Sequence, residues 1–340
     1  MAGNNVRGAL LALLAFAIFA THDVVVKVLG ADYHAVQIIF FAGLFGVPLV
    51  SLMLIRERGD GDLRPRRPGW MALRTVAVVI TGVTAFYAFS VLPLAETYAI
   101  LFAAPLLITV LAIPILGEKV GLRRGLAVLA GLAGVLIVLR PGVQALSLGH
   151  AAALTAAVGG AVASVIVRKI GGVERASVLL LYPMLANLAV LGAALPLVYR
   201  PMAIGDLGLM AVIAAMGLVA TFTIIAAYRS AEAVVVAPMQ YSQMVWAAIF
   251  GYAIFGEVPD AATILGASVI IASGLYIVLR EARVSRTSPV LRTQARPETG
   301  NLPRVSALMG LSGRRIDPRG RPPDAPPDGP ANPAPGTPRR

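Results

Sequence analysis

Three ionisable side chains interrupt an apolar stretch near the start of the chain. His22, Asp23 and Lys27 lie in the segment THDVVVK, between VRGALLALLAFAIFA and VLG. A charged side chain at the centre of a bilayer costs about 2.5–3.5 kcal/mol, so such groups usually face a wet cavity or one another. Asp23 and Lys27 are four residues apart with the acid first, which favours an ion pair along one helix. The alternative for Lys27 is a side chain that extends to the membrane surface.

His22 is about 100° around the helix from Asp23, which predicts a different neighbour for it. An imidazole can exchange protons at physiological pH, so His22 and Asp23 together are candidates for a proton pathway. A hydrogen bond from His22 to another helix explains the residue equally well.

A second polar group interrupts a later apolar segment. Gln240, Tyr241, Gln243 and Trp246 follow one another at spacings that place Gln240, Gln243 and Trp246 on one helix face. Amides and an aromatic plane on one face suit a planar or zwitterionic metabolite. Hydrogen bonding between helices is the alternative role for the amides.

Further polar residues lie at segment ends. Glu96 and Glu232 open apolar segments, either as pathway residues or as helix caps that interact favourably with the helix N-terminus. Tyr87 is predicted to line a vestibule, and Arg74 to anchor its helix at the headgroups. Two prolines inside apolar segments are predicted to break helices beside a cavity: Pro105 and Pro238.

The elements that must position these residues are membrane helices. Hydrophobic residues make up 58% of the chain, charged residues 14%, and the mean hydropathy is +0.80. Segments of about 20 apolar residues are long enough to cross the hydrocarbon core of a bilayer. The sequence therefore predicts an all-α polytopic membrane protein with ten transmembrane helices, over approximately 6–30, 34–55, 70–92, 95–116, 122–140, 148–168, 177–199, 207–228, 231–255 and 261–280.

The basic residues predict the orientation of these helices. Lys and Arg gather in RERGDGDLRPRRPG, in GEKVGLRR and in RKIGGVER, whereas GADYH and EVPD contain neither. Because cytoplasmic loops are enriched in Lys and Arg, both termini are predicted to be cytoplasmic. The net charge of +12 is spread over these loops and the C-terminal segment, without a basic helix face, so no nucleic-acid partner is expected.

The segment 282–340 differs from the rest of the chain. It is rich in Pro and Arg and has almost no apolar periodicity, which predicts a disordered cytoplasmic tail. The chain contains no cysteine, three histidines, no phosphate-binding loop and no metal-binding spacing. We therefore expect no enzymatic activity, no metal and no cofactor.

An internal repeat divides the apolar region. GEKVGLRRGLAVLAGLAGVLIVLR at 117–140 and GEVPDAATILGASVIIASGLYIVLR at 256–280 each open with Gly-Glu and close with Ile-Val-Leu-Arg. Two halves of five helices must enter the membrane in opposite directions, which places Glu118 inside and Glu257 outside. Inverted repeats are typical of secondary transporters, whose substrate site lies near the midplane between the halves.

The repeated Gly117-Glu118 and Gly256-Glu257 helix ends and the string VAPMQYSQMVWAAIFGYAIFGEVPDAATILGASVIIASGLYIVLRE resemble the paired EamA domains of the drug/metabolite transporter superfamily. The resemblance implies a first repeat at 1–145, a second at 146–281 and a carrier in a bacterial inner membrane. It also implies a small organic substrate, of the riboflavin or S-adenosylmethionine type, possible homodimers and contact with membrane lipid. Export of amino acids or other metabolites is the alternative, and a receptor or structural membrane protein is a remote one.

Overall fold

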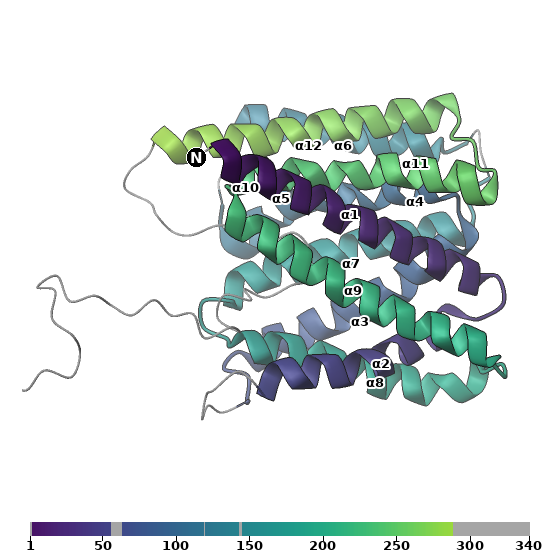
Figure 1. Ribbon diagram of the computed structural model, residues 1–340. Coiled ribbons are helices and arrows are strands. Elements are labelled where there is room, and N and C mark those ends of the chain that lie inside the picture. The colour runs from purple at the N-terminus through teal and green to yellow at the C-terminus, as the bar shows by residue number, and fades with distance from the viewer. Residues whose placement is uncertain (1, 56–62, 119, 143–144, 288–340) are drawn as a thin grey trace, which may run out of the picture.

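The computed structural model describes residues 2–55, 63–118, 120–142 and 145–287, and each regular element in them is a helix. The fold class predicted from the sequence is confirmed: the protein is all-α (Figure 1). The ten predicted spans correspond to α1 (Ala2–Gly30), α2 (Ala35–Ile55), α3 (Pro68–Val91), α4 and α5 (Leu94–Leu101 and Ala103–Leu116), α6 (Leu122–Leu139), α7 (Leu148–Ile170), α8 (Ala176–Val198), α9 (Ile204–Ser230), α10, η1 and α11 (Ala233–Val236, Ala237–Tyr241 and Ser242–Phe255) and α12 (Ala261–Thr287).

Eight helical segments among the described residues are long and apolar enough to cross a membrane, counting α4 and α5 as one. The two other predicted spans are also helical. One is α2, whose shorter apolar part is Ala35–Pro48, and the other is divided into α10, the 3₁₀ helix η1 and α11. The predicted tail begins inside a helix, because α12 continues to Thr287; the rest of it, 288–340, lies outside the described residues.

The helices run roughly along one direction, so the bundle has two ends. α1 begins and α12 ends at the same end, here called the N-terminal end (Figure 1). α1, α3, α6, α8 and α11 end, and α2, α4, α7, α9 and α12 begin, at the opposite end, here called the far end. α2, α5, α7 and α9 end, and α3, α6, α8 and α10 begin, at the N-terminal end.

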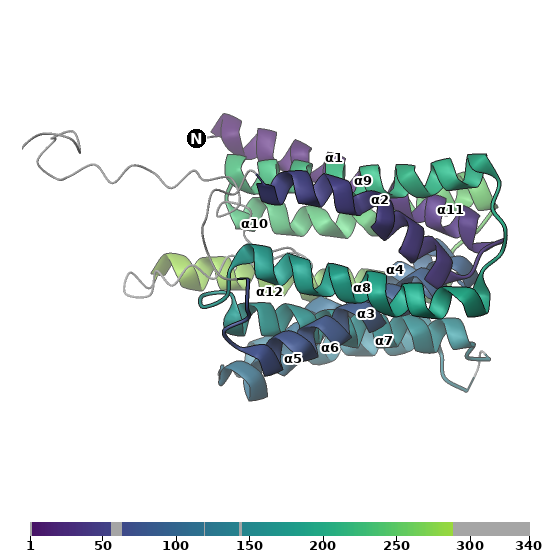
Figure 2. The ribbon, with the colours of Figure 1, turned by 90° about the horizontal axis from the view of Figure 1, so that it is seen from below.

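Helices of one predicted half pack along helices of the other half. α1 lies along α9, α3 lies along α7, and α6 lies along α12 (Figure 2). In the predicted repeat, α1 corresponds to α7 and α9 to α3, so the first two pairs are equivalent to each other. This is the packing that two oppositely inserted halves would produce, although the boundary at 145/146 stays a prediction.

Both spans that contain a predicted helix-breaking proline are interrupted. α4 ends at Leu101, the residue whose carbonyl loses a partner because Pro105 has no N–H. Pro238 lies in η1, between α10 and α11. The breaks are in register although the prolines are not, since Phe102 and Tyr241 each lie 15 residues before the Gly of Gly-Glu. The rings of these two residues are in contact, with centroids 5.2 Å apart.

Small residues allow α6 and α12 to approach closely. A β-carbon added to Gly266 would lie 2.5 Å from the backbone oxygen of Gly134. One added to Gly131 would lie 2.4 Å from the hydroxyl oxygen of Ser273. The two backbones therefore occupy the space that larger side chains would need.

We expect Gly266→Ala to destabilise the protein by about 1–3 kcal/mol, because the new β-carbon would overlap the backbone oxygen of Gly134 as well as the Val138 side chain, and only a separation of α6 from α12 can relieve the backbone overlap. Gly125→Ala in α6 is the matched control, since a β-carbon there meets nothing within 4 Å. Thermal unfolding of the purified protein in detergent would measure both variants. Equal midpoints for the two would contradict the close contact.

Candidate functional site

A polar network connects α1 to the broken fourth span. Asp23 Oδ1 lies 2.8 Å from His22 Nδ1, and the Tyr98 hydroxyl donates a hydrogen bond to Asp23 Oδ2. Gln243 Nε2 lies 3.5 Å from the Tyr98 hydroxyl oxygen, at the limit of a hydrogen bond. The side chains of His22 and Asp23 are only 15% and 14% exposed. The His22 ring meets Phe86 edge-on, with centroids 6.0 Å apart, so it has a neighbour on another helix as predicted, and it also contacts the adjacent carboxylate.

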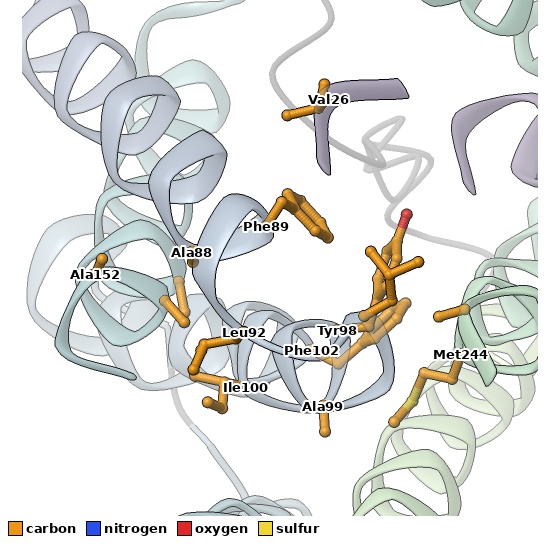
Figure 3. Packing of buried hydrophobic residues seen from close by; sticks show 14 of the residues in the cluster. Val26, Ala88, Phe89, Leu92, Tyr98, Ala99, Ile100, Phe102, Ala152 and Met244 are labelled. Carbon is orange, nitrogen blue, oxygen red and sulfur yellow. The ribbon is translucent and has the colours of Figure 1, made fainter. Parts of the chain in front are cut away.

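The tyrosine in this network is held by aromatic neighbours (Figure 3). The Tyr98 ring meets Phe89 edge-on at 5.2 Å and stacks on Phe102 at 6.2 Å, between ring centroids. Phe102 in turn contacts Tyr241. Asp23 therefore bonds to a hydroxyl whose position is fixed by packing at the point where α4 ends.

Lys27 does not pair with Asp23, so the prediction of an ion pair along α1 is wrong. Lys27 Nζ lies 2.7 Å from Glu257 Oε1 and also donates to the carbonyl of Leu92. Its side chain is 12% exposed, so it does not extend to the surface either. Asp23 is bonded to Tyr98 and His22, whereas Lys27 is paired with a residue in the second predicted half of the chain.

A cavity of about 370 Å³ lies between α1, α2, α3, α8 and α9. Most of its wall is apolar, with Phe40 and Phe86 as aromatic surfaces. Its polar groups come from three helices: His22 from α1, Arg74 from α3 and Asn187 from α8. Sites for small molecules typically combine such an apolar wall with a few polar groups that fix orientation.

Arg74 is a residue whose role the sequence did not reveal. It was predicted to anchor α3 at the headgroups, but it is 1% exposed, and its Nη1 donates to the carbonyl of Leu179 over 2.6 Å. A buried guanidinium at a cavity wall is a strong site for a carboxylate or phosphate. The sequence did not indicate this burial, because Arg74 lies close to a basic connection, where an arginine usually reaches the surface.

The predicted amide and aromatic face of the ninth span is not continuous. Gln240 and Tyr241 lie in η1, whereas Gln243 and Trp246 lie in α11. Gln243 approaches Tyr98, but Trp246 stacks on Phe250, with centroids 5.7 Å apart. The predicted face is therefore divided between a 3₁₀ helix and an α-helix.

The two acidic residues at segment starts differ. Glu96 is in the first turn of α4, is 7% exposed, and its Oε1 lies 2.9 Å from His150 Nε2. Glu232 precedes α10 and is exposed. Glu96 lies 21 residues before Gly117 and Glu232 lies 24 before Gly256, so their distances from the repeated Gly-Glu differ. Tyr87 packs partly buried against the main hydrophobic cluster.

A second cavity, of about 430 Å³, lies at the far end between the start of α4, the end of α6, α11 and the start of α12. Glu96, Glu257, Asp260 and Arg140 contribute charged groups to it. Each carboxylate is already engaged: Glu96 by His150, Glu257 by Lys27 and Asp260 by Arg140. Each of these pairs joins the ends of two helices. Among the described residues, no cluster of three His, Asp or Glu side chains could hold a metal ion.

The fold and the cavity between α1, α2, α3, α8 and α9, here called the central cavity, define an integral, multi-pass membrane protein of the transporter class. The EamA-like transporter family matches residues 6–140. The chain is 30% identical over 249 residues to a riboflavin transporter of Rhizobium johnstonii, covering 70% of this chain and 79% of that protein. The protein belongs to the EamA-like transporter family of the drug/metabolite transporter superfamily.

Other relatives carry different names. The chain is 27% identical over 272 residues to an S-adenosylmethionine uptake transporter of Rickettsia bellii, covering 80% of this chain and 93% of that one. It is 28% identical over 285 residues to the pseudopaline exporter CntI of Pseudomonas aeruginosa, covering 82% and 96%. A crystal structure with 20% identity shares the fold with a TM-score of 0.54, over 80% of this chain and 97% of the other. The class of activity is therefore transport of small metabolites and not enzymatic catalysis.

Proposed function

We propose that the protein takes up a zwitterionic metabolite of the S-adenosylmethionine type across a bacterial inner membrane, by alternating access between two inverted halves, 1–145 and 146–281. Distribution of Lys and Arg in the connections supports a cytoplasmic N-terminal end. The far end would then face the periplasm.

The observation that carries this proposal is the set of groups around the central cavity. Arg74 offers a buried cation for a carboxylate, and Phe40 and Phe86 offer faces for a planar ring. On the α1 side, His22 lines the cavity and is bonded to the Asp23 carboxylate, which suits the cationic part of a zwitterion. A neutral ring compound of the riboflavin type would use the aromatic faces but would bring no carboxylate to the guanidinium.

The same pair of residues supports coupling to protons. When His22 Nδ1 donates its hydrogen bond to Asp23, the other ring nitrogen, Nε2, is free of hydrogen and can accept a proton. An imidazole beside a carboxylate can take up a proton without creating an isolated charge in the membrane. Substrate and proton would then use adjacent sites on α1, at the wall of the cavity.

Transport by purified protein in liposomes tests the proposal. Vesicles preloaded with unlabelled S-adenosylmethionine should accumulate the labelled compound by exchange, and riboflavin should compete weakly. An imposed pH gradient should drive net movement if protons are coupled, and the direction of that movement distinguishes uptake from export. Exchange of riboflavin without exchange of S-adenosylmethionine would overturn the proposed substrate class.

A further inference from the structure

Among the ion pairs that connect the predicted halves of the molecule, two involve the last turn of the first helix of a half, one at each end of the bundle. At the far end, Lys27 near the end of α1 pairs with Glu257, which follows α11. At the N-terminal end, Arg168 near the end of α7 pairs with Glu118, which follows α5. Each pair therefore joins the first helix of one half to the fourth span of the other half.

The four residues occupy equivalent positions in the two halves. Lys27 lies three residues before Gly30, and Arg168 lies three residues before Gly171. Each glutamate follows a glycine in the left-handed conformation, Gly117 with φ 73° and Gly256 with φ 66°. A residue with a side chain rarely adopts this conformation, so the glycine ends the helix and directs the glutamate back towards the bundle.

The backbone around both glutamates has the same hydrogen bonds. Glu118 N donates to Ala112 O over 3.3 Å, and Glu257 N donates to Gly251 O over 2.9 Å. The Gly-Glu repeat that marked the two halves in the sequence thus forms one structural device, present at both ends.

A second crosswise link accompanies each ion pair. At the far end, the Tyr33 hydroxyl after α1 donates to Asp206 Oδ2 in the first turn of α9, over 2.7 Å. At the N-terminal end, Glu174 Oε1 after α7 accepts from the N–H of Arg67, just before α3, over 2.5 Å. Because α1 and α9 correspond to α7 and α3, these links are equivalent as well.

The two ends differ in how firmly they are closed. Glu257 also accepts a hydrogen bond from Leu94 N over 2.9 Å, and Lys27 also donates to Leu92 O. The side chains of Lys27 and Glu257 are 12% and 19% exposed, against 30% and 32% for Arg168 and Glu118. Since attraction between charges weakens as water approaches, the far-end pair is the stronger closure.

We propose that these ion pairs are the two gates of the carrier: Lys27–Glu257 closes the far end, and Arg168–Glu118 closes the N-terminal end. Opening one end separates its pair while the other pair holds the halves together. This proposal rests on the proposed alternating-access transport, but it assigns Lys27 and the repeated glutamates to gating and not to substrate contact. The structure corresponds to a state in which the far end is the more tightly closed.

Accessibility of the central cavity tests the gates without any substrate. Because the chain has no cysteine, Ala214→Cys, at the cavity wall, provides a single reactive thiol. A membrane-impermeant maleimide is added from either side of sealed vesicles of known orientation, and the labelling rate is measured. Glu257→Gln removes the charge but keeps an acceptor for Leu94 N, and Glu118→Gln removes the charge at the other gate.

We expect Glu257→Gln to raise labelling from the far side by about threefold or more, and to lower it from the N-terminal side. Glu118→Gln should change both rates in the opposite directions. Lys27→Gln should change the labelling rates as Glu257→Gln does, and Arg168→Gln should change them as Glu118→Gln does. At the more exposed gate, the exchange Glu118→Arg with Arg168→Glu should return the rates towards those of the unmodified gate.

Asp260→Asn is the matched control, because Asp260 also forms an ion pair at the far end, with Arg140, but joins α6 to the start of α12 and does not involve α1 or α7. It should leave both labelling rates unchanged. Equal shifts in Glu257→Gln and Glu118→Gln, or no shift in either, would overturn the gate assignment. The labelling assay contains no substrate, so its result does not depend on the proposed substrate class. If the labelling rates shift in opposite directions but S-adenosylmethionine is not transported, only the proposed substrate is refuted.

Discussion

Asp23→Asn is expected to reduce transport by about 100-fold while the protein still inserts at normal abundance. Asparagine has nearly the shape of aspartate and can still accept the hydrogen bond from Tyr98. The charge that balances a protonated His22 or a cationic substrate is lost, which we expect to cost about 2.7 kcal/mol in the transport step. Initial rates in liposomes at several pH values measure both the loss and the flattening of the pH dependence.

The double variant Asp23→Asn with Lys27→Met separates a pathway role from simple charge balance. If Asp23 only neutralised Lys27, removing both charges would restore transport. Lys27 is bonded to Glu257 instead, so the second substitution should bring no recovery. Rates in the double variant equal to those of the unchanged protein would refute the pathway role of Asp23.

Arg74→Gln is expected to raise the half-saturating concentration of a carboxylate-bearing substrate by about 10–100-fold. A hydrogen bond to a charged group contributes about 1.5–3 kcal/mol, and a neutral amide cannot replace the guanidinium at the cavity wall. The maximal rate should change less, because the bond is expected both at binding and during transport. Concentration dependence of exchange in liposomes measures the two constants separately.

Two controls accompany Arg74→Gln. Arg74→Lys keeps the charge but not the planar fork, so it should give an intermediate half-saturating concentration. Arg123→Gln removes an exposed arginine of α6 and should have no effect on either constant. A variant of Arg74 with unchanged affinity but lower abundance would show that the residue acts only in packing, through its bond to Leu179.

Much of the fold could be predicted because the governing terms are local. Ten apolar segments and their polar boundaries are properties of short windows of sequence, and a segment of this length in lipid must satisfy its backbone hydrogen bonds as a helix. The two Gly-Glu helix ends were also visible, since only glycine readily adopts the left-handed conformation that ends each helix. Pro105 and Pro238 marked the interrupted spans for a similarly local reason.

The site was less predictable because its bonds join distant segments. The sequence by itself determined that His22, Asp23 and Lys27 lie in a membrane helix and need partners there. Only the tertiary structure decided that Asp23 bonds to Tyr98 and that Lys27 bonds to Glu257. It also placed Arg74 at a cavity wall and not at the surface. The physical reason is that spacing along one helix fixes a face, whereas the partner of a buried charge depends on which other helix packs against that face.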